Sequence, residues 1–335
     1  MGLRVGLVGY GLAGRVFHAP LIASTPGLTL AAIVTSSAQR RASASAAHPT
    51  ALLVSTVDEL LALKPDLVVV ATPNDTHVPV ALAAVAAGAA VVVDKPFAGT
   101  VAEATRVVEA ARARSVPLTV FQNRRWDSDF LTLRSLLDAG ALGTVARFES
   151  RFERWSPDVV EGWRESPGGG VLHDLGSHLV DQAVELFGPV RSAYAEVAAR
   201  RASAVADDDV FVSLTHVGGV RSHLWASACA AHHGPRFRVL GSKSAYVSYG
   251  LDGQEEALSR GERCDDLSTP GLLGVLSNAV PVSGVPGAYG EFYRLVEASL
   301  TSGGPLPVDV GSAVYTLGVL EAAVTSGATG RVVEL

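Results

Sequence analysis

The chain has 335 residues, of which 48% are hydrophobic and 18% charged, and its formal net charge is −6. This length and composition indicate a globular protein of two domains and exclude a disordered chain. The acidic balance excludes the basic surface that nucleic acid or anionic lipid requires. Cys229 and Cys264 are the only cysteines. They exclude a disulfide framework and a paired-cysteine metal site, and they favour a reducing, cytoplasmic location.

The sequence predicts neither a leader nor a membrane segment. The amino terminus lacks a basic region followed by a small-residue cleavage site, and its apolar run is the first expected strand. The uncharged, largely apolar run Val78–Val93 contains Pro79 and Gly88. It is too short to span a bilayer, so we expect a helix, a glycine stop and a buried strand there.

The first third of the chain alternates expected strands with expected helices. Strands are expected at the apolar runs Arg4–Val8, Thr29–Val34, Leu67–Ala71, Ala90–Val93 and Pro117–Phe121. Helices are expected at Ala13–Ser24, Ala38–Ala47, Val78–Ala87 and Val101–Arg114. Apolar runs without alternation are typical of strands buried on both faces. Residues 1–121 are therefore predicted to form a doubly wound parallel sheet of the Rossmann type, a dinucleotide-binding α/β domain.

The pattern changes after Gln122. Alternating strands are expected at Val145–Phe152, Arg191–Arg200, Val210–Thr215, Arg221–Ala228, Arg236–Gly241 and Ala245–Gly250. Helices are expected at Leu131–Ala139, Leu172–Leu186, Tyr289–Thr301 and Val310–Thr325, while Gly253–Pro286 is expected to be irregular. Residues 122–335 are therefore predicted to form a second, substrate-bearing α+β domain, whose large, mostly antiparallel sheet carries helices on one face.

A glycine-rich turn follows the first expected strand. It reads Gly9-Tyr10-Gly11-Leu12-Ala13-Gly14, a G-x-G-x-x-G motif between a strand and a helix. The first glycine permits the sharp turn, the second lets a phosphate approach bare backbone, and the third lets helix and strand pack closely. The helix N-terminus then offers unpaired N–H groups to a diphosphate, so the motif predicts a dinucleotide site.

The end of the second expected strand bears on the cofactor. NAD-binding folds place a carboxylate there for the ribose hydroxyls, whereas this chain has Thr35, Ser36 and Ser37, with Arg40 close behind. Hydroxyls and a guanidinium can hold a 2′-phosphate that a carboxylate would repel, which favours NADP over NAD. The alternative is that Arg40 and its neighbour Arg41 only solvate a helix.

Polar residues also follow the expected strand at Leu67–Ala71. The sequence there is Ala71-Thr72-Pro73-Asn74-Asp75-Thr76-His77. Open α/β sheets bind ligands at the carboxyl ends of their strands, which favours a role in cofactor binding. An N-cap at Asp75 or Thr76 would explain only one or two of these residues.

The next expected strand delivers a lysine to the same edge, in Asp94-Lys95-Pro96. A lysine in the nucleotide crevice can touch a ribose and a substrate hydroxyl, and its charge favours the alkoxide form of that hydroxyl. The Lys95–Pro96 bond is a candidate cis peptide. A plain surface charge is the alternative, and the strand-end placement argues against it.

A run of glycines, Gly168–Gly170, precedes a helix that carries Asp174 and His178. Residues four apart share a helix face, and Asp181 continues the stripe. Histidine suits proton removal from a hydroxyl, and the carboxylate can orient the ring or the substrate. Two alternatives remain: a metal pair that uses His173 and His178, and a structural Asp–His pair. We expect no metal.

These motifs, in this order, resemble the Gfo/Idh/MocA oxidoreductases over essentially the whole chain. The nearest likeness is to the bacterial branch that contains NADP-dependent scyllo-inositol dehydrogenases. Besides the motifs above, the resemblance rests on Phe17-His18-Ala19-Pro20, on Asp94 through Phe97, and on Asn123-Arg124-Arg125-Trp126-Asp127-Ser128-Asp129-Phe130. Gly169 and Gly170 through Asp174, Gly176, His178 and Asp181 complete it.

The resemblance implies a catalytic Lys–Asp–His group, which maps onto Lys95, Asp174 and His178. It implies that Thr72, Asn74 and His77 lie along the cofactor, and that Asn123, Arg124 and Trp126 line the route to the substrate. It also implies that copies associate as a homodimer or homotetramer through the sheet of the second domain. We further expect Asp94, Pro96 and Asn123 to contact the cofactor, and Arg124, Trp126, Trp163 and His173 to contact the substrate. Two departures stand out: the family's usual Glu-Lys-Pro is Asp94-Lys95-Pro96, and Thr35 replaces the usual acid after the second strand.

We therefore expect reversible oxidation of a secondary alcohol on a polyol, inositol or sugar, with NADP or NAD as the cofactor. In this hypothesis His178 removes the hydroxyl proton, Lys95 stabilises the developing alkoxide and Asp174 holds the imidazole or a substrate hydroxyl. One alternative is redox-cycling glycoside cleavage, in which reduced cofactor does not accumulate. The other is a nucleotide sensor that has lost its chemistry.

Overall fold

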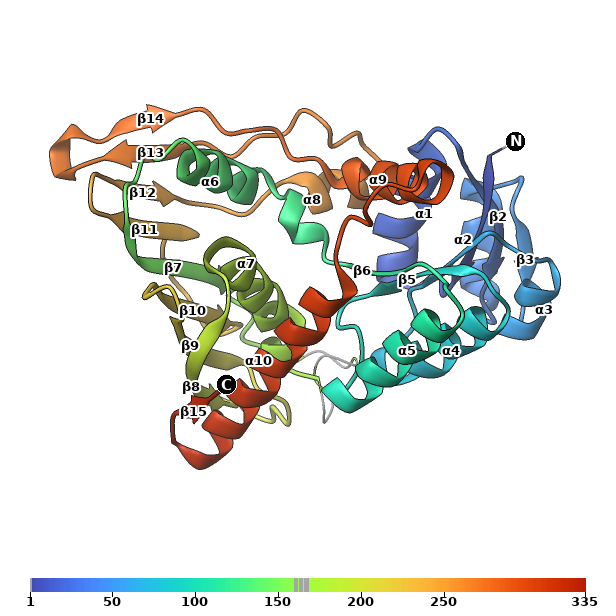
Figure 1. Ribbon diagram of the computed structural model, residues 1–335, viewed down its shortest axis with the longest axis horizontal. Coiled ribbons are helices and arrows are strands. Elements are labelled where there is room, and N and C mark those ends of the chain that lie inside the picture. Colours follow the sequence, from blue (N-terminus) through green and yellow to red (C-terminus); the bar gives the residue numbers. More distant parts are fainter. Residues whose placement is uncertain (1, 160–161, 163–164, 166–168) are drawn as a thin grey trace. The chain divides into compact units, whose positions relative to one another are not determined.

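The computed structural model describes residues 2–159, 162, 165 and 169–335. The chain forms two compact units, each assembled from several segments (Figure 1). The first unit ends its main segment at Asn123 and adds Gln254–Asp265 and Ala288–Val314. The second contains Arg124–Gly253, Asp266–Gly287 and Tyr315–Leu335. The expected domain boundary after residue 121 lies two residues before the point at which the chain first passes from the first unit to the second. The two later segments of the first unit, however, were expected in the second domain.

The first unit is built on a parallel six-stranded sheet in the order β3-β2-β1-β4-β5-β6. Its strands are β1 (Leu3–Val8), β2 (Leu28–Val34), β3 (Leu52–Val54), β4 (Leu67–Val70), β5 (Ala90–Asp94) and β6 (Leu118–Phe121). This order confirms the predicted doubly wound fold. The direction of winding reverses between β1 and β4, and ligands bind at such a reversal beyond the carboxyl ends of the strands.

Seven helices of the first unit surround this sheet in the described part of the chain. They are α1 (Ala19–Ser24), α2 (Ala38–Ala47), α3 (Val57–Ala62), α4 (His77–Ala86), α5 (Val101–Ala113), α8 (Gln254–Ser259) and α9 (Tyr289–Ser302). Ser37, Thr56 and Thr100 cap α2, α3 and α5 by accepting a backbone N–H three residues on. In Figure 1, α4 and α5 lie together on one face of the sheet and α1 and α9 on the other.

Two differences from the expected elements matter in this unit. The helix expected over Ala13–Ser24 begins with a π-helical turn, Gly14–His18, before α1. The sequence analysis also missed β3 and α3, which are three and six residues long. Neither is long enough to show a clear periodicity, and β3 forms because β2 offers it a paired edge.

The second unit contains a nine-stranded sheet in the order β14-β13-β12-β11-β7-β10-β9-β8-β15. Its strands are β7 (Val145–Glu153), β8 (Val190–Ala198), β9 (Asp209–His216), β10 (Arg221–Ser227), β11 (Phe237–Gly241), β12 (Ala245–Ser248), β13 (Gly271–Gly274), β14 (Val280–Val282) and β15 (Val333–Glu334). All neighbours are antiparallel except β7 and β10. The mostly antiparallel sheet is thereby confirmed.

Helices cover one face of this sheet (Figure 1). They are α6 (Ser128–Asp138), α7 (Ser177–Phe187) and the part of α10 (Val310–Thr329) that follows Val314. The core between helices and sheet contains Phe130, Leu179 and Leu320 on the helices and Phe148 and Tyr246 on the strands. As in the first unit, the helix expected at Leu172–Leu186 begins with a π-helical turn, Leu172–Gly176.

The expectation that Gly253–Pro286 is irregular was wrong. The segment contains α8, β13, a 3₁₀ turn at Leu276–Asn278 and β14. The strand β13 forms by pairing with β12, and the Tyr246 ring lies where a side chain at Gly271 would be, 2.4 Å from the ideal Cβ position. Such pairing partners are distant in sequence, so local composition alone predicted a loop. No helix in the described part of the chain is long and apolar enough to cross a membrane.

Candidate active site

The three glycines after β1 meet different surroundings. Gly9 has φ +100°, and a Cβ there would lie 2.4 Å from the Ala71 carbonyl oxygen. A Cβ on Gly14 would lie 2.1 Å from the Gly9 carbonyl oxygen. A Cβ on Gly11 would have no atom of the described residues within 4 Å. The backbone itself therefore requires glycine at positions 9 and 14, while position 11 presents bare backbone to open space.

Two buried polar atoms at the carboxyl ends of strands in this sheet lack a partner in the described part of the chain. Among the described residues, neither Thr72 Oγ1, after β4, nor Gln122 Oε1, after β6, has a hydrogen-bond partner. Leaving a buried polar atom unsatisfied is costly, so such atoms indicate a bound partner. Together with the open backbone at Gly11, they fit a dinucleotide whose diphosphate lies on the glycine turn and whose sugars follow the strand ends.

The residues after β2 divide into buried and exposed groups. Thr35 is buried, and its carbonyl accepts a hydrogen bond from Arg41. The Arg41 guanidinium also donates to the Leu53 carbonyl, so it ties β2 to β3. Ser37 caps α2 by accepting the backbone N–H of Arg40. Ser36 and Arg40 are exposed at this end of the sheet, so a ligand can reach both side chains.

His77 is buried, and its ring lies between the loop that follows β4 and the loop that follows β5. His77 Nδ1 lies 2.9 Å from the Pro96 carbonyl oxygen, and Nε2 lies 2.9 Å from the Thr72 carbonyl oxygen. The imidazole therefore lies within hydrogen-bond distance of both carbonyl oxygens and bridges the two strand ends. Thr76, one of the two alternative caps, does occupy the N-cap position of α4, but its hydroxyl makes no cap bond to the helix and donates instead to the Pro73 carbonyl.

Lys95 follows β5 directly at the same edge. Its backbone N–H donates to Asp94 Oδ1 at 2.8 Å, and the Lys95–Pro96 peptide is cis, as predicted. The chain has three lysines, Lys64, Lys95 and Lys243, whereas it has 24 arginines. An ammonium at this position is therefore a rare choice in this sequence, and it stands where the fold places ligands.

In the second unit, the π-helical turn carries Asp174 and leads into α7, which carries His178. Both side chains are buried, with 6% and 5% exposure. The His178 ring lies 6.3 Å from the Phe152 ring, and the Arg124 guanidinium lies over the same ring at 5.0 Å. The unit therefore brings the predicted base and the predicted substrate residue Arg124 together around Phe152.

Further along, α7 holds the segment Asn123–Trp126 in place. Arg125 makes a two-bond ion pair with Asp181, at 2.7 and 2.8 Å, and contacts Glu185 at 2.7 Å. Gln182 Nε2 donates to the Arg124 carbonyl at 2.8 Å. Asp181, which continues the polar stripe of the helix, thus serves to anchor Arg125.

A buried arginine lies beneath this cluster. Arg236 is 2% exposed, its Nε lies 2.9 Å from Asp129 Oδ2, and its guanidinium stacks 4.2 Å from the Phe152 ring. Burial lowers the pKa of Arg236, although the charge of Asp129 opposes the shift. Arg236 also donates to Gln182 Oε1. The Phe152 ring, which contacts Arg124 and His178, therefore also packs against Arg236, whose charge is paired with that of Asp129.

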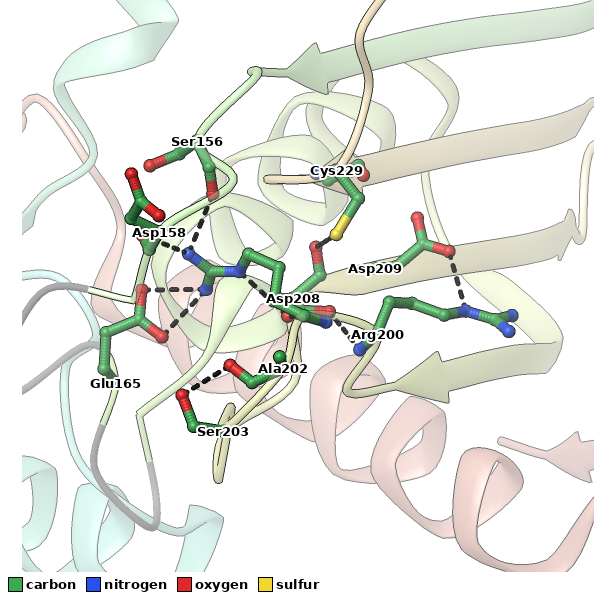
Figure 2. A network of polar contacts seen from close by, with 11 residues as sticks. Ser156, Asp158, Glu165, Arg200, Ala202, Ser203, Asp208, Asp209 and Cys229 are labelled. Atoms are coloured by element: carbon green, nitrogen blue, oxygen red, sulfur yellow. Dashed lines mark hydrogen bonds and ion pairs between the residues drawn. The ribbon is translucent and has the colours of Figure 1, made fainter.

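A second ion-pair network includes Glu165, which precedes the turn with Asp174 in the sequence (Figure 2). Arg201 donates twice to Glu165, at 2.8 Å each, and to Asp208 at 2.9 Å. The neighbouring Asp207 accepts the Leu172 N–H at 2.7 Å, and a Cβ on Gly170 would lie 2.0 Å from Asp207 Oδ1. The glycine before the turn is therefore required by a carboxylate that caps it, and not only by a ligand.

The remaining predicted substrate residues, Trp126, His173 and Trp163, differ in their burial and in whether the structure describes them. Trp126 is buried. His173 is half-buried, and its Nδ1 has no hydrogen-bond partner among the described residues. Trp163 lies outside the described residues. The described part of the chain contains no cluster of three or more His, Cys, Asp or Glu side chains that could hold a metal.

Sequence reasoning missed several residues of these clusters. Gln122 carries the same signal as Thr72, a polar residue directly after a buried strand, and could have been found by it. Phe152 and Arg236 could not, because their strands look like ordinary sheet. The predicted group itself is divided between the units: Lys95 belongs to the first, and Asp174 and His178 belong to the second.

Comparison with known proteins agrees with this arrangement. Residues 3–122 match the family model described as "Oxidoreductase family, NAD-binding Rossmann fold", and residues 130–247 match "GFO/IDH/MocA C-terminal domain". The chain is 42% identical over 336 residues to the uncharacterized oxidoreductase YdgJ of Escherichia coli strain K12, covering 97% of this chain and 96% of YdgJ. It is 33% identical over 349 residues to scyllo-inositol 2-dehydrogenase (NADP(+)) IolW of Bacillus subtilis strain 168, covering 99% and 96%.

Solved structures are also similar. The yvaA protein of Bacillus subtilis has a TM-score of 0.94 at 32% identity and covers 100% of this chain and 99% of its own. The YPO2259 protein of Yersinia pestis has a TM-score of 0.92 at 37% identity, with 100% and 97% covered. The fold and these relatives define an NAD(P)-dependent oxidoreductase. The chain belongs to the Gfo/Idh/MocA family.

The glycine geometry gives a first prediction. Gly11→Ala adds a methyl group into open space, so stability should change by less than about 1 kcal/mol while NADPH affinity falls at least tenfold. Gly9→Ala should instead destabilise the fold, by about 1–2 kcal/mol from its backbone angle alone. Thermal denaturation and titration of NADPH fluorescence measure both effects. Unchanged affinity in Gly11→Ala would show that the cofactor does not lie on this turn.

Proposed function

We propose that this protein reversibly oxidises a secondary alcohol of a polyol, inositol or sugar, with NADP as the preferred cofactor. The observation that carries the proposal is Lys95, one of only three lysines, at the carboxyl-end edge of the same sheet that carries the open glycine turn. The relative IolW, which is named for oxidation of scyllo-inositol with NADP, supports the substrate class.

In the proposed reaction each residue has one task. The bound nicotinamide supplies the hydride acceptor. His178 takes the proton of the substrate hydroxyl, since imidazole titrates near neutral pH. Lys95 stabilises the oxygen as negative charge develops on it. Asp174 orients the imidazole or a neighbouring hydroxyl. The proposal requires Lys95 of the first unit and His178 of the second to face one substrate.

The alternatives to this proposal give different readouts. In redox-cycling glycoside cleavage the cofactor is regenerated in each cycle, so no reduced cofactor accumulates in solution. A nucleotide sensor would bind cofactor without any turnover. A screen of both cofactors against inositols, aldoses and small aldehydes, followed at the absorbance of reduced nicotinamide, separates all three.

The catalytic group gives a second prediction. Lys95→Ala should lower kcat by about 100-fold or more, the usual effect of removing a group that stabilises the developing charge. His178→Ala should lower kcat by about 10²–10⁴-fold, as for loss of a general base. Both proteins should unfold near the wild-type temperature and still bind NADPH. Full turnover in either variant would contradict its assigned role.

The preference for NADP rests on the exposed residues after β2. Ser36 and Arg40 are accessible, and the segment 35–41 contains no carboxylate that would repel a 2′-phosphate. Arg41, by contrast, is bound to backbone carbonyls of β2 and β3. Arg40 is therefore the guanidinium that we assign to the 2′-phosphate.

The third prediction compares these two arginines. Arg40→Ala should raise the KM for NADP at least tenfold and leave the KM for NAD within about twofold, because one charge-assisted contact of about 1.5–3 kcal/mol is lost. Arg41→Ala should instead lower stability and affect both cofactors alike. Steady-state kinetics with each cofactor decide. An equal effect of Arg40→Ala on both cofactors would remove the basis for NADP preference.

We also propose that copies of the chain associate through the sheet face opposite α6 and α7. On this face Trp225 stacks 3.9 Å beneath the Arg151 guanidinium and 5.2 Å from the Phe211 ring. His223 lies 6.2 Å from the same indole. A cluster of aromatic and arginine side chains is typical of the centre of a protein interface.

A fourth prediction tests this association. Trp225→Glu should weaken self-association at least about 30-fold, the effect of losing a 2 kcal/mol interface contact. Leu52→Glu, at a residue of β3 in the first unit that is 56% exposed, serves as the control. Sedimentation or light scattering across a dilution series measures both. A Trp225→Glu protein that keeps the wild-type mass at every concentration would exclude this face.

A further inference from the structure

His18 is a wholly buried histidine in the π-helical turn that follows the glycine motif. Its exposure is 0%, and its ring stacks on the ring of Phe121, at the end of β6, with centroids 4.4 Å apart. The sequence analysis assigned this residue no role. A buried imidazole must satisfy two nitrogens, so its surroundings show what it does.

One nitrogen faces α9. His18 Nδ1 lies 2.6 Å from the Tyr293 hydroxyl, and Tyr293 is itself completely buried. Burial raises the pKa of Tyr293 well above its usual value, so the phenol keeps its proton and can donate it to Nδ1. Tyr293 belongs to Ala288–Val314, the late segment that packs with the first unit.

The other nitrogen faces the residue before Lys95. His18 Nε2 lies 3.8 Å from Asp94 Oδ2, which is within ion-pair range but longer than a hydrogen bond. Among the described residues Nε2 has no hydrogen-bond partner. Burial alone would raise the pKa of Asp94, but His18, aided by His77 and Lys95, holds it below its usual value.

Asp94 passes this constraint to the lysine. Its Oδ1 accepts the Lys95 backbone N–H at 2.8 Å, so one carboxylate faces the imidazole and also fixes the lysine's amide. The groups form a chain: Tyr293 donates to His18, the Nε2 side of His18 faces Asp94, and Asp94 holds Lys95. A carboxylate beside Nε2 favours the proton on that nitrogen, which leaves Nδ1 to accept from the phenol.

We propose that His18 and Tyr293 are positioning residues, which hold Asp94 so that the Lys95 side chain is fixed at the edge of the cofactor site. The proposal rests on the role of Lys95 in the proposed function. His18 acts through Asp94 and does not itself need to touch cofactor or substrate. The late segment Ala288–Val314 thereby supplies part of the support of the lysine.

Two substitutions separate the two nitrogens of His18. In His18→Asn the amide reaches the position of Nδ1, so it keeps an acceptor for Tyr293 but loses the donor toward Asp94. In His18→Gln the amide reaches the position of Nε2 and keeps that donor. We expect His18→Asn to lower kcat at least tenfold, with KM for alcohol and cofactor within threefold, and His18→Gln to keep at least a third of wild-type kcat.

Stability measured on the same proteins distinguishes positioning from a general packing role. Both variants should lose similar thermal stability, since both replace a buried ring. His216 provides a matched control in the second unit, because it is buried and bonded to the Gly188 carbonyl and the Ser222 hydroxyl. His216→Asn should lower stability with kcat unchanged. If kcat follows melting temperature across all three variants, the proposal is wrong.

A readout that needs neither cofactor nor turnover uses the three lysines. Protein labelled with ¹³C at the lysine ε-carbon should give three resonances, and Lys95 is assigned by its loss in Lys95→Arg. We expect the Lys95 resonance to shift in His18→Asn and Asp94→Asn but not in His18→Gln, with Lys64 and Lys243 unchanged. A Lys95 resonance unaffected by His18→Asn would overturn the proposal.

The kinetic measurements and the lysine resonances together also separate this proposal from the proposed function. If the wild-type protein oxidises no polyol with either cofactor, the proposed function fails, and the lysine resonances alone decide whether His18 positions Lys95. If turnover is present but survives Lys95→Ala, the catalytic role of the lysine fails while the resonance test still stands.

Discussion

The close approach of backbone to backbone at the glycine turn is the constraint on which the first unit depends. At Gly9 and Gly14 the neighbouring carbonyl oxygens lie 2.4 and 2.1 Å from where a Cβ would stand, so no other residue allows the turn. This packing directs the N-terminus of the following helix to the edge where the sheet reverses direction. Gly11 is left with open space above it, and the strand ends around it carry the polar atoms that a dinucleotide can satisfy.

Both clusters of candidate functional residues include a π-helical turn at the start of a helix. One turn, Gly14–His18, follows the glycine motif, and the other, Leu172–Gly176, carries Asp174. Such turns are uncommon and often occur at functional sites. In each case a side chain from a distant segment supports the turn: Tyr293 bonds to His18, and Asp207 caps Leu172.

Buried charge in the second unit is arranged in pairs. Arg125 bonds to Asp181 and Arg236 lies against Asp129, all four being less than 9% exposed. Removing one member of such a pair leaves an uncompensated charge in the interior, which is strongly destabilising. These pairs hold Phe152 and the Arg124 segment beside α7, next to the ring of His178.

The sequence by itself determined the doubly wound sheet, the glycine turn and the strand-end position of Lys95, because these follow from local patterns: unbroken apolar runs, glycine spacing and residues adjacent to a strand. It also predicted a mostly antiparallel second sheet from alternation. Only the tertiary structure revealed β13 and β14, the return of Ala288–Val314 to the first unit, and the contacts of His18, Phe152 and Arg236. These depend on partners more than 80 residues away in sequence or on strand pairing, which no local pattern encodes.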